Sequence, residues 1–394
     1  MRIAYIAPYQ GPELLKRRPV LHNLALAGNV KIELIAELLR RGNHEVDVIS
    51  QGEVVEQRFR LYGAFSEPRP FHPQIQVHYA STVPVKFLNG FWSVAKTLSL
   101  FKEMHRATPY DLVIIYNLKR PQVVCAEYAI RHLGLPVVFE YEDDAFVNRD
   151  GKPVRGLRAG LYLREARRVV NSASACIGVS PYLLSRVPAS LPQMLLRGVV
   201  LEEILRAGER PMASREKWVA YSGTHVHDKG LEPLIEAWNS KELPGWELHI
   251  AGRGVLTPRL EKMAEPNKSI VFHGLLDRAA NARLLGSSSI AINPHDLSET
   301  PGNIFAFKII EYLAAGAHCV TTPMGMLEAD LERGITYMPD NHSKTIASTL
   351  ARVIDGRLYD RVAAQAAQNT YGPEAVSKAL NTLLDQVHDA RQVA

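Results

Sequence analysis

Short apolar segments alternate with longer segments of helical character along the whole 394-residue chain. The apolar segments are rich in valine, isoleucine and leucine, a composition that predicts buried strands. Because two parallel strands need a long crossover between them, strands that alternate with helices predict parallel sheets with helices on both faces. The sequence therefore predicts an α/β fold, and nearly half of the chain is hydrophobic, which is enough for two cores.

The segment 206–216 is polar and interrupted by glycine and proline, so it is the best candidate for a linker between two halves. Before it we expect a helix over 29–41, and strands over 2–8, 44–50, 76–79, 112–116, 137–141, 175–179 and 194–196. After it we expect helices over 231–239, 258–264 and 372–387, and strands over 218–221, 247–251, 270–272, 290–292 and 317–321. The predicted domains are 1–205 and 206–370, followed by a C-terminal helical segment over 371–394.

The composition restricts the partners of the chain. Its net charge of +5 and pI of about 9 suit anionic partners such as diphosphates or acidic lipid surfaces, but are too slight to indicate nucleic-acid binding. The three cysteines lie far apart, which indicates neither a disulfide framework nor a metal site and favours a reducing compartment. The chain opens on an apolar strand, and no run of about 18 apolar residues occurs, so we expect a cytoplasmic protein that is soluble or at most peripheral on a membrane.

A second-half segment that ends at Gly316 predicts a buried helix. A proline–glycine pair precedes it, Asn303 is a good N-cap, and Gly316 stands where a helix end favours a left-handed residue. The residues between are apolar almost all the way round, which is typical of a helix in a domain interior. The helix nevertheless carries Lys308 and Glu311. Such charges are costly unless they are paired with each other or offered to a ligand, and these residues alone leave both interpretations open.

This helix resembles the donor-binding helix of family 4 of the retaining glycosyltransferases. The resemblance implies the GT-B fold, in which two Rossmann-like domains face each other across a cleft and a C-terminal helix crosses back to the first domain. The family has two glutamates eight positions apart, and Glu311 matches the second, which binds the nucleotide ribose. Asn303 replaces the first, as in a subgroup that resembles surface-polysaccharide transferases and carries Asn-x-Phe-x-x-Lys-x-x-Glu-Tyr. The residues expected in the donor site are Asn303, Ile304, Phe305, Lys308 and Glu311.

A second motif of the donor site follows the strand predicted at 218–221. Gly223 would let the backbone approach a phosphate, and Lys229 would add charge to the N-terminus of the next helix, although most lysines at such a spacing are solvated. The segment resembles the family motif Gly-Arg-x4-Lys-Gly, whose arginine and lysine bind the donor diphosphate. Lys229 and Gly230 match, whereas Thr224 replaces the arginine. We infer that Lys308 supplies the second cation.

Two further turns are expected near the nucleotide. Gly252 and Gly254 flank Arg253 at the end of a strand, and they indicate either a plain tight turn or the family turn that borders the base. His273, one strand later, resembles the turn whose backbone meets the edge of the base. We interpret its side chain as structural rather than catalytic.

The first domain carries carboxylates at 140–144, directly after a predicted strand. Clustered carboxylates can bind a divalent metal, or they can be an N-cap and solvated charges. Since GT-B enzymes characteristically work without a catalytic metal, we expect no metal and assign Glu142 and Asp143 to recognition of the acceptor. Gly28 and Asn29 precede a predicted helix at the position of the glycine-rich loop of the family, where backbone amides would face the donor phosphate or the acceptor. The segment 8–22 is predicted as a basic loop and lacks the Gly-x-Gly-x-x-Gly spacing of dinucleotide-binding enzymes.

Two segments suggest contact with an anionic membrane surface. The segment 87–102 is aromatic at its start and ends in lysine, and the segment 155–168 is crowded with arginines. Aromatic side chains beside cations favour an anionic lipid interface. A stripe that faces the core and a solvated basic face would explain the same residues, and both interpretations stay open.

The resemblance implies a metal-independent retaining glycosyltransferase with no cofactor other than the nucleotide-sugar co-substrate. Its acceptor would be a glycan, a lipid-linked molecule or a small molecule. Lys229 and the start of the donor-binding helix would neutralise the departing diphosphate, which takes the proton of the attacking hydroxyl. Two alternatives are a nucleotide-sugar epimerase or glycosyl phosphorylase of the same fold, and a non-catalytic partner subunit. The replacements at Thr224 and Asn303 favour the second.

Overall fold

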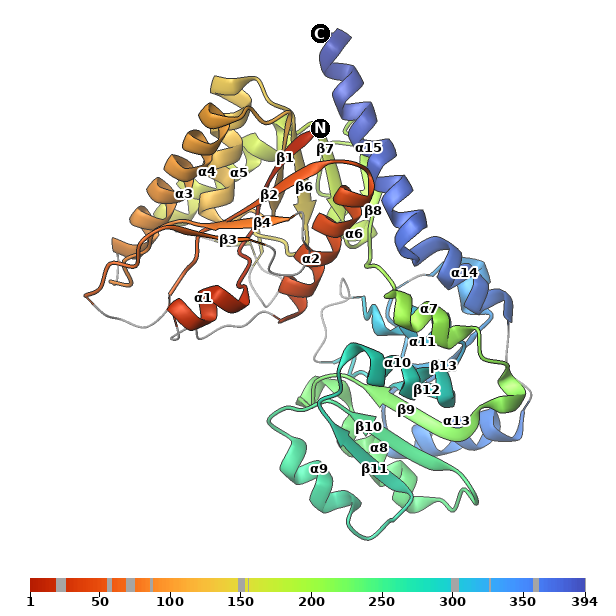
Figure 1. The fold of residues 1–394 in the computed structure, drawn as a ribbon. Helices are drawn as coiled ribbons and strands as arrows, with labels where there is room; N and C mark the ends of the chain where they lie inside the picture. The colour runs from red at the N-terminus through yellow and green to blue at the C-terminus, as the bar shows by residue number, and fades with distance from the viewer. Residues whose placement is uncertain are drawn as a thin grey trace. The chain divides into compact units, whose positions relative to one another are not determined.

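The computed structural model describes residues 1–18, 26–54, 59–68, 75–85, 88–147, 153–154, 156–298, 305–325, 327–356 and 361–393. The chain forms two compact units (Figure 1). The first comprises Met1–Arg197 together with Val376–Ala394, and the second comprises Gly198–Ala375.

The described strands of the first unit form one sheet of eight, in the order β3-β4-β2-β1-β5-β6-β7-β8. They are β1 (Arg2–Ile6), β2 (Glu45–Ser50), β3 (Phe65–Pro68), β4 (Gln76–Tyr79), β5 (Leu112–Tyr116), β6 (Val137–Tyr141), β7 (Ala175–Gly178) and β8 (Gln193–Leu195). All neighbours are parallel except β3 and β4. The chain leaves β1 toward β2 on one side and returns to β5 on the other, so the strand order reverses between β1 and β5.

Helices cover both faces of this sheet, as the alternating pattern predicts. The helices of the unit are α1 (Pro12–Arg17), α2 (Leu26–Arg41), α3 (Leu88–Ala107), α4 (Arg120–Tyr128) with its π-helical extension η1 (Ala129–Leu133), α5 (Leu157–Ser172), α6 (Pro181–Leu184) and most of α15 (Pro373–Val393). Helices α3, α4 and α5 lie side by side and pack on one core (Figure 1). Helix α15 lies beside α2, where Ser377 Oγ donates a hydrogen bond to the carbonyl of Leu38 at 3.1 Å.

The second unit has six described strands, all parallel, in the order β11-β10-β9-β12-β13-β14. They are β9 (Glu216–Ser222), β10 (Glu247–Ala251), β11 (Ile270–Gly274), β12 (Ser288–Asn293), β13 (His318–Thr321) and β14 (Ile335–Tyr337). The strand order reverses between β9 and β12, and in open α/β sheets ligands bind beyond the carboxyl ends of strands at such a reversal.

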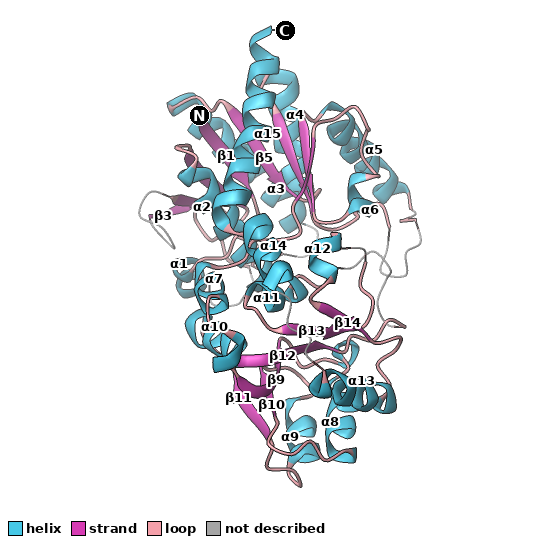
Figure 2. Cartoon of the chain, turned by 90° about the vertical axis from the view of Figure 1, so that its right-hand side faces the viewer, coloured by secondary structure: helices cyan, strands magenta, loops and turns pink. Residues whose placement is uncertain are grey.

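Two cores sandwich the second sheet (Figure 2). One core includes α7 (Glu202–Gly208), α10 (Arg278–Ser287), α11 (Lys308–Ala314), α12 (Ala329–Glu332) and α14 (Arg361–Tyr371). The other includes α8 (Leu231–Ser240), α9 (Thr257–Ala264) and α13 (Ser343–Asp355). The short 3-10 turns η2 (Met212–Ser214) and η3 (His227–Lys229) complete the unit.

The structure differs from the predicted elements at several places. Residues 12–17 form α1 where a loop was expected, and the edge strands β3 and β14 were not predicted. The second unit begins at Gly198, before the expected linker, because α7 packs into the core of that unit through Ile204. No helix among the residues that the structure describes is both long and apolar enough to cross a membrane.

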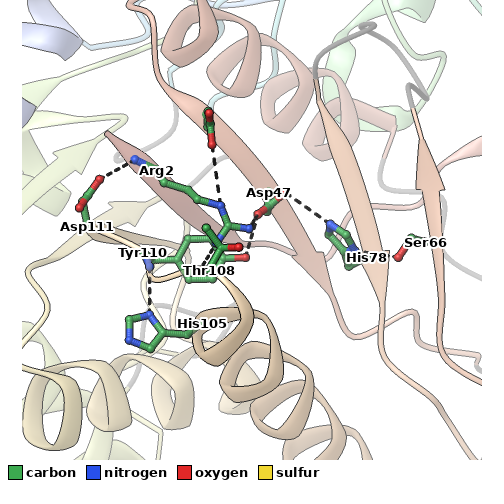
Figure 3. Close-up of polar contacts among 9 residues, drawn as sticks. Arg2, Asp47, Ser66, His78, His105, Thr108, Tyr110 and Asp111 are labelled. Carbon is green, nitrogen blue, oxygen red and sulfur yellow. Dashed lines mark hydrogen bonds and ion pairs between the residues drawn. The ribbon is translucent and has the colours of Figure 1, made fainter.

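Polar side chains tie together the amino ends of the central strands in the first unit (Figure 3). Asp47 on β2 is their centre: it pairs with Arg2, accepts a hydrogen bond from Tyr110 Oη at 2.9 Å and lies 3.4 Å from His78 Nε2. Burial alone would raise the pKa of Asp47, but these partners hold it below its usual value. Ligands of α/β sheets bind at the opposite ends of the strands, so we assign this network to stability.

Candidate functional site

The loop that leaves β9 comes close to the start of α11. Gly223 has a φ of +156°, and its amide donates a hydrogen bond to the carbonyl of Ala251 at 3.1 Å. A side chain at this position would meet the ammonium group of Lys308. Glycine therefore leaves the room that Lys308 occupies, and the two predicted donor motifs lie together at the carboxyl end of β9.

Lys308 is desolvated, and no carboxylate of the described residues pairs with it. Its Nζ lies 3.3 Å from Tyr221 Oη and 4.3 Å from the centre of that ring. Burial, and then the neighbouring Lys229, lower the pKa of Lys308 to about 7, while Glu311 and Asp228 act in the opposite direction. Lys308 forms no ion pair with any residue that the structure describes, so the interpretation of Lys308 and Glu311 as a direct pair is wrong.

Lys229 ends η3 and precedes α8, as its motif predicts. Its ammonium donates a hydrogen bond to Asp228 Oδ2 at 2.6 Å, and its side chain is 22% exposed. Gly230 follows with a φ of +65°, and any Cβ there would overlap the carbonyl of Pro294. Lys229 and Lys308 are far apart in the sequence but close enough in the structure for the charge of Lys229 to lower the pKa of Lys308. Of the two, Lys229 is paired with a carboxylate, that of Asp228.

Glu311 and Tyr312 follow Lys308 on α11. Burial raises the pKa of Glu311, while Lys308 lowers it. Tyr312 Oη donates to the carbonyl of Ser222 at 3.3 Å and accepts from its amide at 3.1 Å, which fixes α11 against the end of β9. Sequence reasoning missed this role of Tyr312, although the tyrosine is part of the motif that identified the helix.

Helix α11 is shorter than predicted and begins at Lys308, not after Asn303. Asn303 and Ile304 lie outside the described residues. The prediction that places Phe305 inside the helix is wrong, because residues 305 and 306 pack against the core outside the helix and Phe307 is its N-cap residue. The ring of Phe307 lies 6.2 Å from that of Tyr371 in an edge-to-face contact. Gly316 ends the helix with a φ of +78°, which confirms the predicted left-handed residue.

The turn at Gly252 is set by close backbone packing. Gly252 has a φ of +122°, and its amide donates to the carbonyl of Gly274 at 2.7 Å. The carbonyl of Arg253 accepts from the amide of His225 at 3.1 Å, while its side chain is exposed. A Cβ at Gly254 would meet the backbone of His225, so close packing explains both glycines of the turn, and a contact of Arg253 with the nucleotide base stays a prediction.

His273 belongs to a row of stacked rings on the sheet. Its Nε2 lies 2.8 Å from Nδ1 of His249, and His249 stacks on Trp218 with ring centres 4.0 Å apart. Burial and the neighbouring His249 lower the pKa of His273. This arrangement supports a structural role for the side chain of His273.

The carboxylates predicted at 140–144 have partners from several elements of the first unit. Glu140 is fully buried and accepts a hydrogen bond from Tyr5, while Glu142 pairs with Lys31. Lys31 also lies 3.6 Å from Glu140. Burial raises the pKa of Glu142 to about 7, against the effect of Lys31.

Asp143 is held by Asn117, the residue after β5. Asn117 has a φ of +59°, and its Nδ2 donates to Asp143 Oδ2 at 3.0 Å. Its Oδ1 accepts from the amides of Glu142 and Asp143 at 2.8 and 3.0 Å. Asn117 thereby fixes the turn that carries Glu142. The sequence does not indicate this role, which depends on the left-handed conformation and the hydrogen bonds of Asn117. No group of three side chains placed to hold a metal ion occurs in the described part of the chain.

Gly28 and Asn29 do not form a loop before a helix. Both lie in the first turn of α2, which begins at Leu26. The side chain of Asn29 brackets the backbone of Gln10: its Nδ2 donates to the carbonyl at 2.7 Å, and its Oδ1 accepts from the amide at 3.1 Å. The predicted loop is therefore wrong, because both residues are helical and the side-chain amide of Asn29 binds the backbone of Gln10.

Comparisons with known proteins agree with this arrangement. Residues 216–356 match the family described as glycosyl transferases group 1, and residues 28–192 match a glycosyl transferase 4-like domain. No curated protein matches the sequence.

Three solved structures share the fold over nearly the whole chain. Sucrose-phosphate synthase from Thermosynechococcus elongatus is 17% identical, with a TM-score of 0.67 over 99% of this chain and 100% of that one. Anabaena HepE, in complex with UDP and glucose, is 16% identical, with a TM-score of 0.63 over 98% and 99%. The lipopolysaccharide outer core galactosyltransferase WaaB is 13% identical, with a TM-score of 0.62 over 98% and 99%. With both domains matched and the fold shared, the chain belongs to the group 1 glycosyltransferases, as a family 4 type enzyme of the GT-B fold.

Proposed function

We propose that the protein transfers a sugar from a nucleotide-sugar donor to a hydroxyl group of an acceptor, with retention of the anomeric configuration. The observation that carries the proposal is the convergence of Lys229 and Lys308 beside Gly223, at the reversal of strand order in the second unit. Two ammonium groups next to a glycine turn suit a diphosphate. Anabaena HepE, which shares the fold, was solved with UDP and glucose and with UDP-glucose.

In the proposed reaction the bond between the anomeric carbon and the diphosphate oxygen breaks while the acceptor oxygen bonds to the same carbon from the same face. The proton of the acceptor hydroxyl passes to the departing phosphate oxygen. Lys229 and Lys308 stabilise the charge that develops on that oxygen, Glu311 binds the ribose, and Asn303 contacts the donor sugar. Because α11 has only seven residues, its dipole contributes less than the longer helix predicted from the sequence would, and the two lysines carry more of the stabilisation.

We propose that the acceptor binds to the first unit at Glu142. Its carboxylate lies at the carboxyl end of β6, next to the reversal of strand order, and is paired with Lys31. We expect it to accept the hydrogen bond of the acceptor hydroxyl, while Asp143 holds the turn through Asn117. A glycan acceptor of a surface polysaccharide is favoured by the Asn-x-Phe-x-x-Lys-x-x-Glu-Tyr pattern of the second unit.

Nucleoside diphosphate binding tests the donor site. We expect one of UDP, GDP and ADP to bind selectively in calorimetric titrations, and we expect Lys229→Ala and Glu311→Ala to weaken that binding by ~10- to 100-fold each, the usual weight of a hydrogen bond to a charged group. The exposed Lys262 and Glu265 lie in the same unit, and their alanine variants serve as matched controls. If no nucleoside diphosphate binds, or if the site variants bind like the controls, the assignment is wrong. Proton NMR of the sugar transferred from the matching donor then reports its anomeric configuration.

We also propose that the α3–α5 surface contacts an anionic membrane. Phe91 on α3 is 68% exposed, and Leu161 on α5 is 64% exposed. Arg120 at the start of α4 lies 5.7 Å from the ring of Phe91. Its charge also lowers the pKa of Tyr162 of α5, against the effect of burial, so a cation lies between α3 and α5. Trp92 is turned inward, where it donates a hydrogen bond to Ser81 Oγ at 3.3 Å.

Sedimentation with lipid vesicles measures this contact. We expect the protein to bind vesicles that contain phosphatidylglycerol, and we expect Phe91→Ser and Arg120→Ser to reduce the bound fraction several-fold. Val255 is 79% exposed in the second unit, so Val255→Ser controls for the loss of an exposed apolar side chain. Equal binding by all four proteins would assign Phe91 to an ordinary solvated surface.

A further inference from the structure

A buried histidine faces the two lysines of the candidate donor site. His295 follows β12, its side chain is only 4% exposed, and its Nε2 has no hydrogen-bond partner among the described residues. The backbone around it is fixed: the carbonyl of His295 accepts from Thr322 Oγ1 at 2.9 Å, and the amide of Asp296 donates to the carbonyl of Asp228 at 2.9 Å. The end of β12 is thereby joined to η3.

The imidazole faces a carboxylate that already has a partner. His295 Nε2 lies 3.6 Å from Asp228 Oδ2, and the same oxygen accepts the hydrogen bond of Lys229 Nζ at 2.6 Å. Asp228 therefore accepts a hydrogen bond from Lys229 on one side, while His295 on the other side lies just beyond hydrogen-bond distance. A neutral imidazole left unpaired beside a carboxylate is poised to gain a proton if the lysine leaves.

Four charged groups act on the protonation of His295. Burial and the two nearby ammonium groups, Lys229 and Lys308, lower its pKa to about 4, while Asp228 and Asp296 act in the opposite direction. A bound diphosphate would add negative charge next to both lysines and would reverse the sign of their combined effect on the imidazole.

We propose that His295 is a positioning residue that replaces Lys229 as the partner of Asp228 when the donor diphosphate binds. Lys229 then turns to the phosphate oxygens, His295 gains one proton from solvent, and its imidazolium pairs with Asp228. The inference rests on the proposed function, since it needs a diphosphate at Lys229. It makes donor binding a proton-linked event and explains why a buried histidine lies behind the lysines.

Proton uptake separates His295 from Lys308. The pKa of Lys308 is about 7, so Lys308 is already mostly charged at about pH 6 and can gain a proton on binding only nearer pH 8. His295 behaves in the opposite way, because an imidazole beside a carboxylate is charged at about pH 6 and largely neutral at about pH 8. The uptake near pH 6 therefore reports His295.

The experiment is calorimetric titration of the intact protein with the nucleoside diphosphate that it binds, in cacodylate, MES and Bis-Tris near pH 6, buffers without phosphate that differ in ionisation enthalpy. We expect the wild type to take up close to one proton more than His295→Gln, a difference that cancels protons carried by the nucleotide. The glutamine keeps a side-chain amide to donate to Asp228 but cannot gain charge. At about pH 8 the two proteins should take up equal numbers of protons.

Asp228→Asn provides a second variant, because His295 then has no carboxylate to pair with and the uptake near pH 6 should fall as it does in His295→Gln. Equal uptake by the wild type and both variants near pH 6 would overturn the inference while leaving the donor site intact. Failure of the wild type to bind any nucleoside diphosphate would overturn the proposed function and this inference with it.

Discussion

Lys308→Met is expected to abolish most donor binding while making the empty protein more stable. Methionine keeps the length of the side chain and loses the charge, so the diphosphate loses one of two cations, and we expect turnover to fall by ~10²- to 10³-fold. The same charge is costly without a ligand, since Lys308 is desolvated beside Tyr221 and has no carboxylate partner among the described residues. Function and stability should therefore change in opposite directions.

The pH dependence of that stability follows from the lowered pKa of Lys308. Its folded-state value of about 7 lies below the ordinary 10.5, so the favourable contribution of neutral Lys308 is present above about pH 10.5 and is lost as the pH falls through 7. We expect Lys308→Met to exceed the wild type in free energy of unfolding by ~2 kcal/mol at or below pH 7, a figure reduced for partial exposure of the side chain, with the advantage shrinking toward pH 10.

Urea unfolding at several pH values measures this difference, and the exposed Lys262 provides the control variant Lys262→Met. A Lys308→Met protein that is less stable than the wild type at every pH would mean that the ammonium stabilises the empty site, for example through Glu311. If Lys308→Met bound the donor as well as the wild type, Lys308 would not belong to the donor site. No cation would then be known to compensate for the motif arginine that Thr224 replaces.

The central strands could be predicted from the sequence because they are buried on both faces. Strands β5, β6 and β10 have the predicted bounds, and their residues are almost all buried. Strand β4 also has the predicted bounds, but its residues alternate between buried and more exposed positions. Strand β3 was missed because it is an antiparallel edge strand with one aromatic residue, Phe65, and three small or polar ones. Its strand character comes from pairing with β4, which local sequence does not encode.

The candidate site could be predicted in part, because its motifs follow strands whose order in the sheet brings them together. Gly223 lies in the loop that follows β9, and Lys308 opens α11, the helix that follows β12; the reversal of strand order between those strands brings the two together. The roles of Tyr221 and His295 could not be predicted, because each depends on a tertiary contact with a residue of another element, Lys308 of α11 and Asp228 of η3. The predicted start of α11 was wrong: the helix begins at Lys308, and its N-cap Phe307 contacts the ring of Tyr371, a tertiary contact that local sequence does not encode.

Gly252→Ala is expected to be among the most damaging single substitutions in the second unit. Gly252 has a φ of +122°, which an L-residue with a side chain rarely adopts, and a Cβ at this position would overlap the carbonyl oxygen of Gly223. That oxygen belongs to the backbone, so relief requires the loops after β9 and β10 to separate and the hydrogen bond from Gly252 to Gly274 to weaken. We expect a loss of ~3 kcal/mol or more in the free energy of unfolding.

Gly245→Ala separates the effect of this close packing from ordinary backbone strain. Gly245 also has a positive φ, +73°, but a Cβ there would meet no atom within 4 Å, so we expect its alanine variant to lose only ~1 kcal/mol. Urea unfolding followed by tryptophan fluorescence compares the two, since Trp218, Trp238 and Trp246 lie in this unit. Because Gly223 adjoins Lys308, folded Gly252→Ala should also bind the nucleoside diphosphate more weakly, whereas Gly245→Ala should bind it normally. Equal losses of stability in the two variants would show that the loops after β9 and β10 can separate freely, and the candidate site would then lack the rigid turn that keeps Lys308 in place.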